Sequence, residues 1–316
     1  MSVVALSGGV GGAKLALGLY RVLPPDTLTL VVNTGDDFDH LGLRICPDID
    51  TALYTLADIE HSGQGWGRRD ETWTLMRVIE SLGEDPWFRL GDADTALHVV
   101  RTHRLRGGAT LSEVIRDFRV RLGITAEILP MTDCRVETRI DTDEGELAFQ
   151  EYFVRRQCRP RTRGIRFAGA AGAAAAPGIL EALSAGDLEA IVLCPSNPYL
   201  SVDPLLAVAD LRAALMQRRV PVIAVSPLIG GTAVKGPTAK IMHELGIETS
   251  AAAIAAHYAG IIDALIIDPV DAAEAAHIPL PVFTLSTLMQ GLDDRIRLAR
   301  FVLQCAQTLR SGSRSP

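Results

Sequence analysis

Short apolar runs alternate with stretches of helical spacing at both ends of the chain. Residues 3–6 and 28–32 are near-continuous apolar runs, which are typical of strands buried on both faces of a parallel sheet. Between them, residues 13–23 carry apolar positions at helical spacing and end at two prolines. The C-terminal half repeats the alternation, with strands expected at 190–194, 220–226, 264–267 and 282–285 and helices at 204–217, 238–245 and 270–276. The pattern predicts a doubly wound, Rossmann-like parallel α/β sheet.

The middle of the chain has a different pattern. Residues 71–123 are helical and amphipathic. Residues 135–154 alternate between polar and apolar positions around a turn that is rich in acidic residues, which indicates a β-hairpin. We therefore predict an inserted helix-plus-hairpin subdomain at residues 62–165. It interrupts a single α/β domain that is made of residues 1–61 and 166–310.

Composition and charge narrow the class of protein. The 316 residues carry a net charge of −7, which is a poor match for a nucleic-acid backbone. The most apolar stretch, residues 168–180, holds three glycines and a proline and is too short to span a membrane. Five scattered cysteines are typical of reduced thiols, and no basic leader precedes the first strand. We expect a cytoplasmic protein that binds neither nucleic acid nor a membrane.

A glycine-rich segment follows the first predicted strand and opens the first helix. It contains Gly8, Gly9, Gly11 and Gly12 and ends at Lys14. Glycines there let the backbone approach a phosphate, and a helix N-terminus offers unpaired N–H groups at a positive dipole end. Lys14 stands where a dinucleotide fingerprint has its third glycine, so the segment is not that fingerprint. We favour phosphate binding; the alternative is a tight turn needed only for packing.

Acidic residues follow the second predicted strand. Asp36 and Asp37 come directly after it, and Asp48 and Asp50 stand shortly beyond. Ligands bind at the carboxyl ends of the strands in an open parallel sheet, so these carboxylates could hold Mg²⁺ or accept a proton from a hydroxyl group. We favour Asp36 first and Asp50 second for this role. The alternative is that Asp48 and Asp50 cap a helix while Asp36 and Asp37 lie in a solvated turn.

Two loops of the C-terminal half also follow predicted strands. One is stiffened by two prolines and contains Ser196, Asn197 and Ser201, whose side chains suit hydrogen bonds to a nucleotide. The other is rich in glycine and contains Lys235, which could neutralise a phosphate. The alternatives are a structural turn with a helix cap for the first loop and a solvated lysine for the second.

Two clusters stand out within the predicted insert. One runs from Trp66 to Trp73 and places aromatic residues beside arginines. The other lies at residues 90–96 and includes Asp92 and Thr95. Exposed aromatic side chains beside arginines could frame a planar ring, although a tryptophan at helical spacing is more often a core residue.

In these motifs the chain resembles the 2-phospho-L-lactate transferases of coenzyme F-420 biosynthesis. The similar segments keep the same order along the chain and are specific in combination: residues 6–15, 33–37, 44–51, 65–67, 71–73, 90–92, 195–198, 226–227 and 235–237. The resemblance implies an enzyme that takes a three-carbon acid activated by guanosine diphosphate (GDP). Its phosphoryl-linked group is passed to the ribityl hydroxyl of the deazaflavin Fo, and GMP leaves. The resemblance also implies Mg²⁺ as cofactor and a homodimer.

The resemblance also suggests roles for individual residues. Asp36 and Asp50 are expected to be catalytic and to hold the metal, and the glycine-rich segment is expected to bind the guanosine nucleotide. We expect further nucleotide contacts from Lys14, Ser196, Asn197, Ser201 and Lys235. The insert would cover the acceptor Fo, and we expect contacts to it from Asp37, Trp66, Asp92 and Thr95.

Two other classes of protein are alternatives to a transferase of this family. A nucleotide- or nucleotide-sugar-binding regulatory protein of related fold would bind its ligand without turnover, but the carboxylates and the tryptophan-bearing insert favour an enzyme. A nicotinamide-dependent oxidoreductase is disfavoured by Lys14, and by apolar residues at the place, about 20 residues beyond the loop, where an acidic residue would bind the ribose. The sequence leaves the donor open between lactyl, enolpyruvyl and glyceryl groups.

Overall fold

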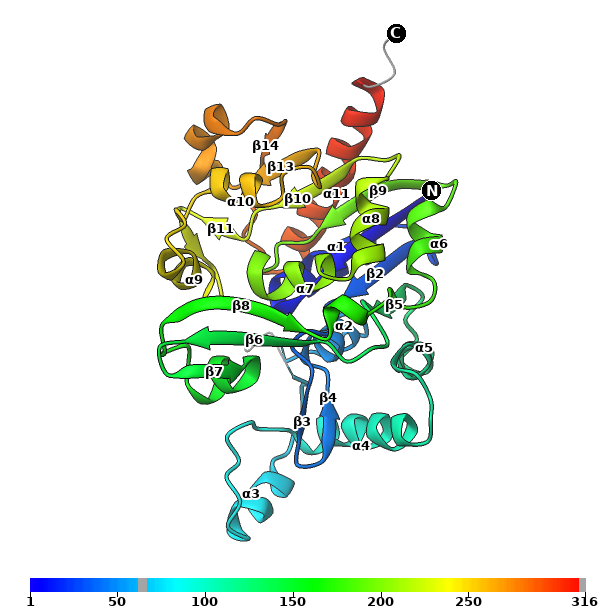
Figure 1. Ribbon diagram of the computed structural model, residues 1–316. Helices are drawn as coiled ribbons and strands as arrows, with labels where there is room; N and C mark the ends of the chain where they lie inside the picture. The colour runs from blue at the N-terminus through cyan, green and yellow to red at the C-terminus, as the bar shows by residue number, and fades with distance from the viewer. Residues whose placement is uncertain (62–66, 313–316) are drawn as a thin grey trace.

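The computed structural model describes residues 1–61 and 67–312. These residues form a seven-stranded parallel sheet in the order β14-β13-β10-β9-β1-β2-β5 (Figure 1). Its strands are β1 (Ser2–Ser7), β2 (Leu28–Val32), β5 (Glu127–Pro130), β9 (Leu188–Leu193), β10 (Val222–Val225), β13 (Ala264–Ile267) and β14 (Val282–Thr284). The predicted doubly wound sheet and its six predicted strands are confirmed. The seventh strand, β5, comes from within the predicted insert.

Both faces of this sheet are buried. Successive residues of each strand point to opposite faces, so each strand contributes to two cores. Val3 and Ala5 of β1 belong to one core, whereas Val4 and Leu6 belong to the other. The first core is covered by α1 (Gly9–Val22), α2 (Pro47–Leu56), α5 (Leu111–Arg121) and α11 (Leu292–Gly312). The second is covered by α6 (Ile179–Ser184), α7 (Asp203–Leu206), α8 (Ala209–Met216), α9 (Thr238–Glu244) and α10 (Ala251–His257). Burial on both faces explains why the strands read as continuous apolar runs.

The direction in which strands are added to the sheet reverses between β1 and β9. From β1 the chain proceeds through β2 to β5, and from β9 it proceeds the other way through β10 and β13 to β14. At such a switch point the loops at the carboxyl ends of the two central strands diverge and leave a crevice. The glycine-rich segment after β1 and the proline-containing loop after β9 flank this point.

Two of the predicted helices differ in form from the expectation. The helix predicted at 204–217 is interrupted and forms α7 and α8, joined through Ala207 and Val208. The helix predicted at 270–276 is a 3-10 helix, Pro269–His277. A π-helical turn, Pro198–Val202, precedes α7. Further along the chain, β11 (Leu228–Ile229) and β12 (Thr232–Ala233) form a small hairpin beside α9.

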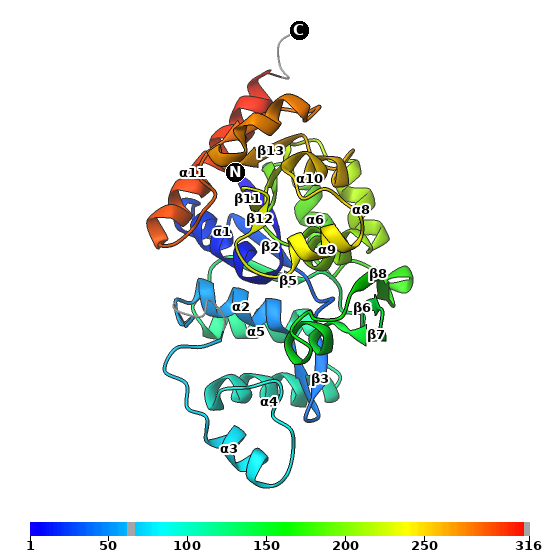
Figure 2. The same cartoon turned by 90° about the vertical axis from the view of Figure 1, so that its left-hand side faces the viewer.

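The region predicted as an insert forms several units. An antiparallel sheet contains the predicted hairpin, β6 (Glu137–Thr142) and β7 (Gly145–Ala148), and a further strand, β8 (Thr162–Ala168). Before the predicted insert, an unpredicted hairpin, β3 (Phe38–His40) and β4 (Leu43–Ile45), contacts α4 (Asp92–Arg106). With α3 (Thr74–Ser81), α4 lies at the end of the molecule opposite the C-terminus (Figure 2). The predicted limits 62–165 thus include β5, an edge strand of the seven-stranded sheet, and the second limit falls inside β8.

No helix in the described part of the chain is long and apolar enough to cross a membrane. The cysteines, all of which lie in that part, are free thiols. Cys46, Cys194 and Cys305 are buried, and burial raises the pKa of each of these thiols. They therefore pack as small apolar side chains.

Candidate functional site

A cavity of about 520 Å³ opens at the carboxyl ends of the central strands. Most of the predicted site residues line it: Gly8, Gly9, Gly11, Lys14, Asp36, Asp50, Ser196, Asn197, Ser201 and Lys235. Loops that follow β1, β2, β9 and β10 therefore meet at one place, as expected for an open parallel sheet. Of the predicted residues that the structure describes, Gly12, Asp37, Asp92 and Thr95 do not line the cavity. Trp66 lies outside the described residues.

The glycines after β1 allow close packing of two loops at the N-terminus of α1. A side chain at Gly11 would overlap the carbonyl oxygen of Pro195, and one at Gly8 would overlap Ser201. Gly9 has a φ of 64°, which glycine adopts without strain. Packing thus accounts for part of the glycine pattern. The same residues keep the backbone of the first turn of α1 bare along the cavity, where its N–H groups can approach an anion.

The loop after β9 is tied to this turn by its polar side chains. The Ser196 hydroxyl accepts a hydrogen bond from the Gly8 N–H at 3.1 Å and donates one to the Gly8 carbonyl at 2.8 Å. The Asn197 Oδ1 accepts from the backbone N–H groups of Tyr199 and Leu200, which caps the following turn. Its amide nitrogen, Nδ2, is buried and has no partner among the described residues. Asn197 therefore carries a donor without a partner among the described residues, in a residue that lines the cavity.

Asp36 and Asp48 form a pair of buried carboxylates at the cavity. Burial, followed by repulsion from Asp48, raises the pKa of Asp36 well above its ordinary value. Burial raises the pKa of Asp48 to about 6, although it accepts hydrogen bonds from the Asn33 side-chain amide and the Gly9 N–H. Oδ1 of Asp36 has no partner among the described residues. Two such carboxylates, one with an unpaired oxygen, fit a hard divalent cation that shares its ligand sphere with phosphate and water.

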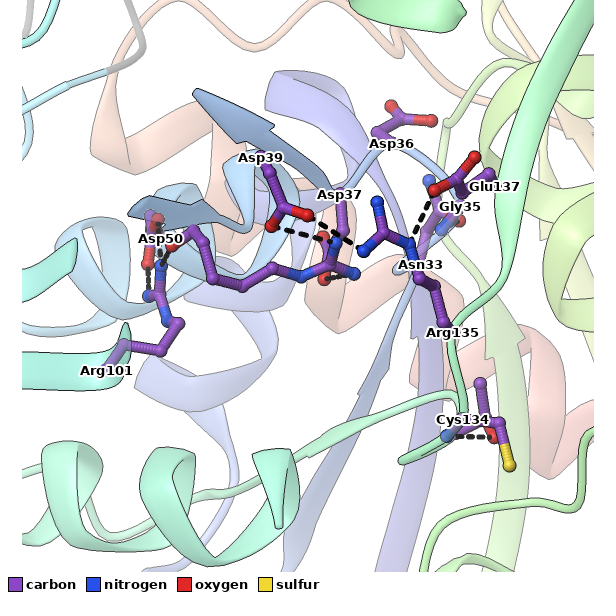
Figure 3. A network of polar contacts seen from close by, with 12 residues as sticks. Asn33, Gly35, Asp36, Asp37, Asp39, Asp50, Arg101, Cys134, Arg135 and Glu137 are labelled. Carbon is purple, nitrogen blue, oxygen red and sulfur yellow. Dashed lines mark hydrogen bonds and ion pairs between the residues drawn. The ribbon is translucent and has the colours of Figure 1, made fainter. Parts of the chain in front are cut away.

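Asp37 and Asp50 are engaged by arginines instead. The Arg44 guanidinium lies 3.5 Å from Oδ2 of Asp37, and the Arg101 guanidinium pairs with both oxygens of Asp50 (Figure 3). Burial raises the pKa of Asp37 to about 7, although the charge of Arg44 lowers it. The alternative that Asp36 and Asp37 lie in a solvated turn is wrong, because both are buried. Asp36 turns its carboxylate away from this arginine network (Figure 3).

The two predicted acceptor contacts on α4 have structural partners. Asp92 caps α3, because its carboxylate accepts from the N–H groups of Thr74 and Leu75 and from the Thr72 hydroxyl. The Thr95 hydroxyl donates to the Gly91 carbonyl one turn earlier. On the same helix, Asp94 and His98 do line the cavity, together with Tyr54 of α2. These three were missed because the spacing of residues on α4 does not show which face of the helix meets α2.

Two lysines line the cavity together with the glycines of the first turn of α1. Lys14 donates to the Met289 carbonyl at 2.8 Å. Burial lowers its pKa, and the positive charges of Arg295 and Lys235 lower it further. Because Lys14 and Lys235 repel each other across the lining, an anion between them would be stabilised by both.

An apolar wall covers another part of the cavity and was not predicted. Phe149 and Phe153 stack with their ring centroids 5.3 Å apart, and Phe88 and Ile45 add to the lining. Phe149 precedes and Phe153 lies within the turn Glu151–Arg155, which follows β7. The cavity thus combines cationic and carboxylate groups with an apolar surface suited to a planar ring. Such a site can bring a phosphate ester and an aromatic acceptor together for displacement at phosphorus.

Known proteins are similar to this chain in sequence. The family model described as 2-phospho-L-lactate transferase CofD matches residues 3–278. A phosphoenolpyruvate transferase of Kitasatospora aureofaciens is 41% identical, with 99% of this chain and 100% of that protein covered. A 2-phospho-L-lactate transferase of Methanopyrus kandleri is 40% identical, with 98% of this chain and 99% of that protein covered.

A solved structure supports the fold independently. A member of the UPF0052 family from Bacillus halodurans superposes with a TM-score of 0.63, covering 96% of this chain and 98% of its own, at 13% identity. At that identity the likeness concerns the fold alone. The family model and the full-length relatives carry the assignment, and the chain belongs to the 2-phospho-L-lactate transferase family, a family of transferase enzymes.

Proposed function

We propose that this enzyme transfers the phosphoryl-linked group of a GDP-activated three-carbon acid to the terminal ribityl hydroxyl of Fo. The hydroxyl oxygen forms a bond to the phosphorus that bears the acid, and the bond from that phosphorus to the bridging oxygen breaks. GMP leaves with the bridging oxygen, the hydroxyl proton is released, and the product is a phosphodiester. The observation that carries this proposal is the pair Asp36 and Asp48 beside the bare first turn of α1 in one cavity.

The diphosphate of the donor is proposed to lie against the N-terminus of α1. Gly8, Gly9 and Gly11 leave room for it, and the helix dipole favours the negative charge. Lys14 and Lys235 lie close enough to repel each other, and both gain from an anion. The unpartnered amide nitrogen of Asn197 supports a further hydrogen bond to the nucleotide. This local arrangement explains how a chain of net charge −7 could bind an anion.

Asp36 and Asp48 are the proposed ligands of Mg²⁺. The cation would neutralise the charge that develops on the leaving phosphate. The described residues hold no group of three or more histidine, cysteine or acidic side chains placed to enclose a metal. Mg²⁺ usually keeps several waters and is held by one or two carboxylates together with substrate phosphates. Asp50, the second predicted ligand, is left out of this proposal because both of its oxygens accept hydrogen bonds from Arg101.

Fo is proposed to place its ring on the apolar wall. The stacked rings of Phe149 and Phe153 give a flat aromatic surface, and Phe88 lies on the same lining. An offset aromatic contact of this kind contributes about 0.5–1.5 kcal/mol beyond the area buried. Since relatives of similar identity are named for phosphoenolpyruvate and for phospholactate, we propose no choice between these donors.

The test is an assay of the purified protein with Fo, Mg²⁺ and each of the GDP-activated lactyl, enolpyruvyl and glyceryl acids in parallel. We expect GMP and an Fo phosphodiester with at least one donor, and none when EDTA replaces Mg²⁺. Absence of product with all three donors would refute the proposal. Tight binding of a UDP-sugar without affinity for Fo would favour the regulatory protein instead.

A further inference from the structure

Asp94 lies on the wall between two cavities. It follows Gly91 in the first turn of α4 and lines both the main cavity and a neighbouring one of about 210 Å³. Its backbone N–H donates to Oε1 of Glu71 at 2.8 Å, which fixes this turn. The side chain is 15% exposed, and the surface it exposes faces these cavities. Asp94 is therefore a carboxylate that is held in place yet open to a ligand.

One oxygen of Asp94 is held by neighbouring side chains. The Tyr54 hydroxyl donates to Oδ1 at 2.5 Å, and Nε2 of His98 lies 3.4 Å from the same atom. Burial opposes the charge on Asp94, but hydrogen bonds from His98 and Tyr54 outweigh it, and the pKa of the carboxyl group lies below its ordinary value. No partner of Oδ2 is found among the described residues. A carboxylate with a low pKa is a weak base, so Asp94 suits hydrogen bonding rather than removal of a proton.

Arg101 determines which nitrogen of His98 carries the proton. A guanidinium nitrogen of Arg101 lies 3.1 Å from Nδ1 of His98. Arginine can only donate, so Nδ1 must accept, and the proton of the neutral ring is on Nε2. His98 is buried, and the proton on Nε2 faces Oδ1 of Asp94, 3.4 Å away. His98 and Tyr54 therefore hold Oδ1 of Asp94, and Oδ2 is the oxygen left for a ligand in the cavity.

A carboxylate oxygen that is open to a cavity matches a hydroxyl group, which can donate a hydrogen bond to it. A phosphate or carboxylate would be repelled by Asp94. We propose that Asp94 binds a hydroxyl group of the polyol chain of the acceptor, with Tyr54, His98 and Arg101 as positioning residues. This inference rests on the proposed function, in which the acceptor Fo carries a ribityl chain.

The test measures binding of Fo by equilibrium dialysis in the presence of GDP and Mg²⁺, without turnover. We compare the wild-type enzyme with Asp94→Asn, which keeps the shape but replaces an acceptor oxygen by a donor. We expect the Kd for Fo to rise about 10- to 100-fold, because a hydrogen bond to a charged group is lost, while the Kd for GDP is unchanged. Asp117→Asn is the control, since it alters a partly exposed carboxylate on α5 that lines neither cavity.

A second series tests the role of His98. His98→Gln retains an N–H donor and should recover part of the affinity for Fo that His98→Leu loses. Thermal unfolding of each variant separates this effect from a loss of fold, which would weaken Fo and GDP binding together.

Each outcome has one meaning. Weaker Fo binding with normal GDP binding in Asp94→Asn supports the inference. Fo binding equal to wild type in Asp94→Asn, or equal loss in the two His98 variants, overturns it while the proposed function stands. A wild-type enzyme that does not bind Fo overturns the proposed function, and this inference with it.

Discussion

Replacing Arg101 by methionine tests how the region around α4 is joined to the central domain. Arg101 is 0% exposed and lies on α4, and its partner Asp50 lies on α2. The guanidinium pairs with both carboxylate oxygens of Asp50 and also donates to the Arg44 carbonyl at 3.3 Å. Methionine has a similar length and no charge, so Arg101→Met leaves the Asp50 carboxylate buried without its counter-ion. The change therefore removes the compensation for a buried charge, with little change in packing volume.

The expected cost follows from this burial. Removing one partner of a buried ion pair destabilises a protein by about 3–5 kcal/mol, because the remaining charge stays out of water. The control is Arg104→Met on the same helix, whose ion pair with Asp117 is partly exposed, at 33% and 40%. An exposed pair contributes about 0–1 kcal/mol. Urea denaturation followed by circular dichroism gives the free energy of unfolding of each variant.

The double variant Arg101→Met with Asp50→Leu completes the test. Exchanging a buried ion pair for apolar residues is often neutral or stabilising, so the double variant should recover most of the stability that Arg101→Met loses. The reasoning is refuted if Arg101→Met costs no more than Arg104→Met. It is also refuted if the double variant is less stable than Arg101→Met, because the lost stability would then come from packing and not from an uncompensated charge.

Three further predictions concern the cavity. Asp36→Asn and Asp48→Asn should each abolish turnover and weaken Mg²⁺ binding measured by calorimetry, while circular dichroism shows a retained fold; full activity in both would remove the metal from this pair. Metal-free enzyme should lose stability as the pH rises from about 4 through about 6, because folded Asp48, with its pKa raised to about 6, retains a proton that the unfolded chain releases at its ordinary value. Asp48 contributes at most about 1.4 kcal/mol per pH unit to this slope, so the stability of Asp48→Asn should fall less steeply with pH than that of the wild type, and an unchanged slope in Asp48→Asn would contradict the assignment. Gly11→Ala should lower both the melting temperature and the affinity for GDP, because the added carbon overlaps the Pro195 carbonyl. The control Gly186→Ala, with no described neighbour within 4 Å of the added carbon, should change neither. Equal effects of the two variants would show that the overlap at Gly11 is relieved.

The architecture of the sheet was predictable because its signal is local. Strands buried on both faces must be apolar throughout, so residues 3–6 and 28–32 are recognisable without knowledge of their neighbours. The rule that ligands bind at carboxyl ends of parallel strands then placed Asp36 and Ser196 at one cavity. The strand β5 was missed because it ends in a proline and lies between the amphipathic helices and the hairpin that were assigned to the insert.

The partners of the acidic residues were not predictable in the same way. Asp48 and Asp50 are two residues apart on one helix, and either could have faced Asp36. The structure directs Asp48 toward Asn33 and the cavity and Asp50 toward Arg101, which is 51 positions away. Spacing on one helix does not contain that information, because it depends on where another helix packs.

Asp92 and Asp94 differ for the same reason: both lie in the first turn of α4, yet Asp92 caps α3 and Asp94 lines the cavity. The sequence by itself determined the order of the strands' apolar runs, the glycine-rich turn and the family motifs, since each depends on residues close together in the chain. Only the tertiary structure decided which carboxylates meet the cavity, which are neutralised by arginine and which cap a helix, because those roles depend on side chains brought together from distant segments and on their exclusion from water.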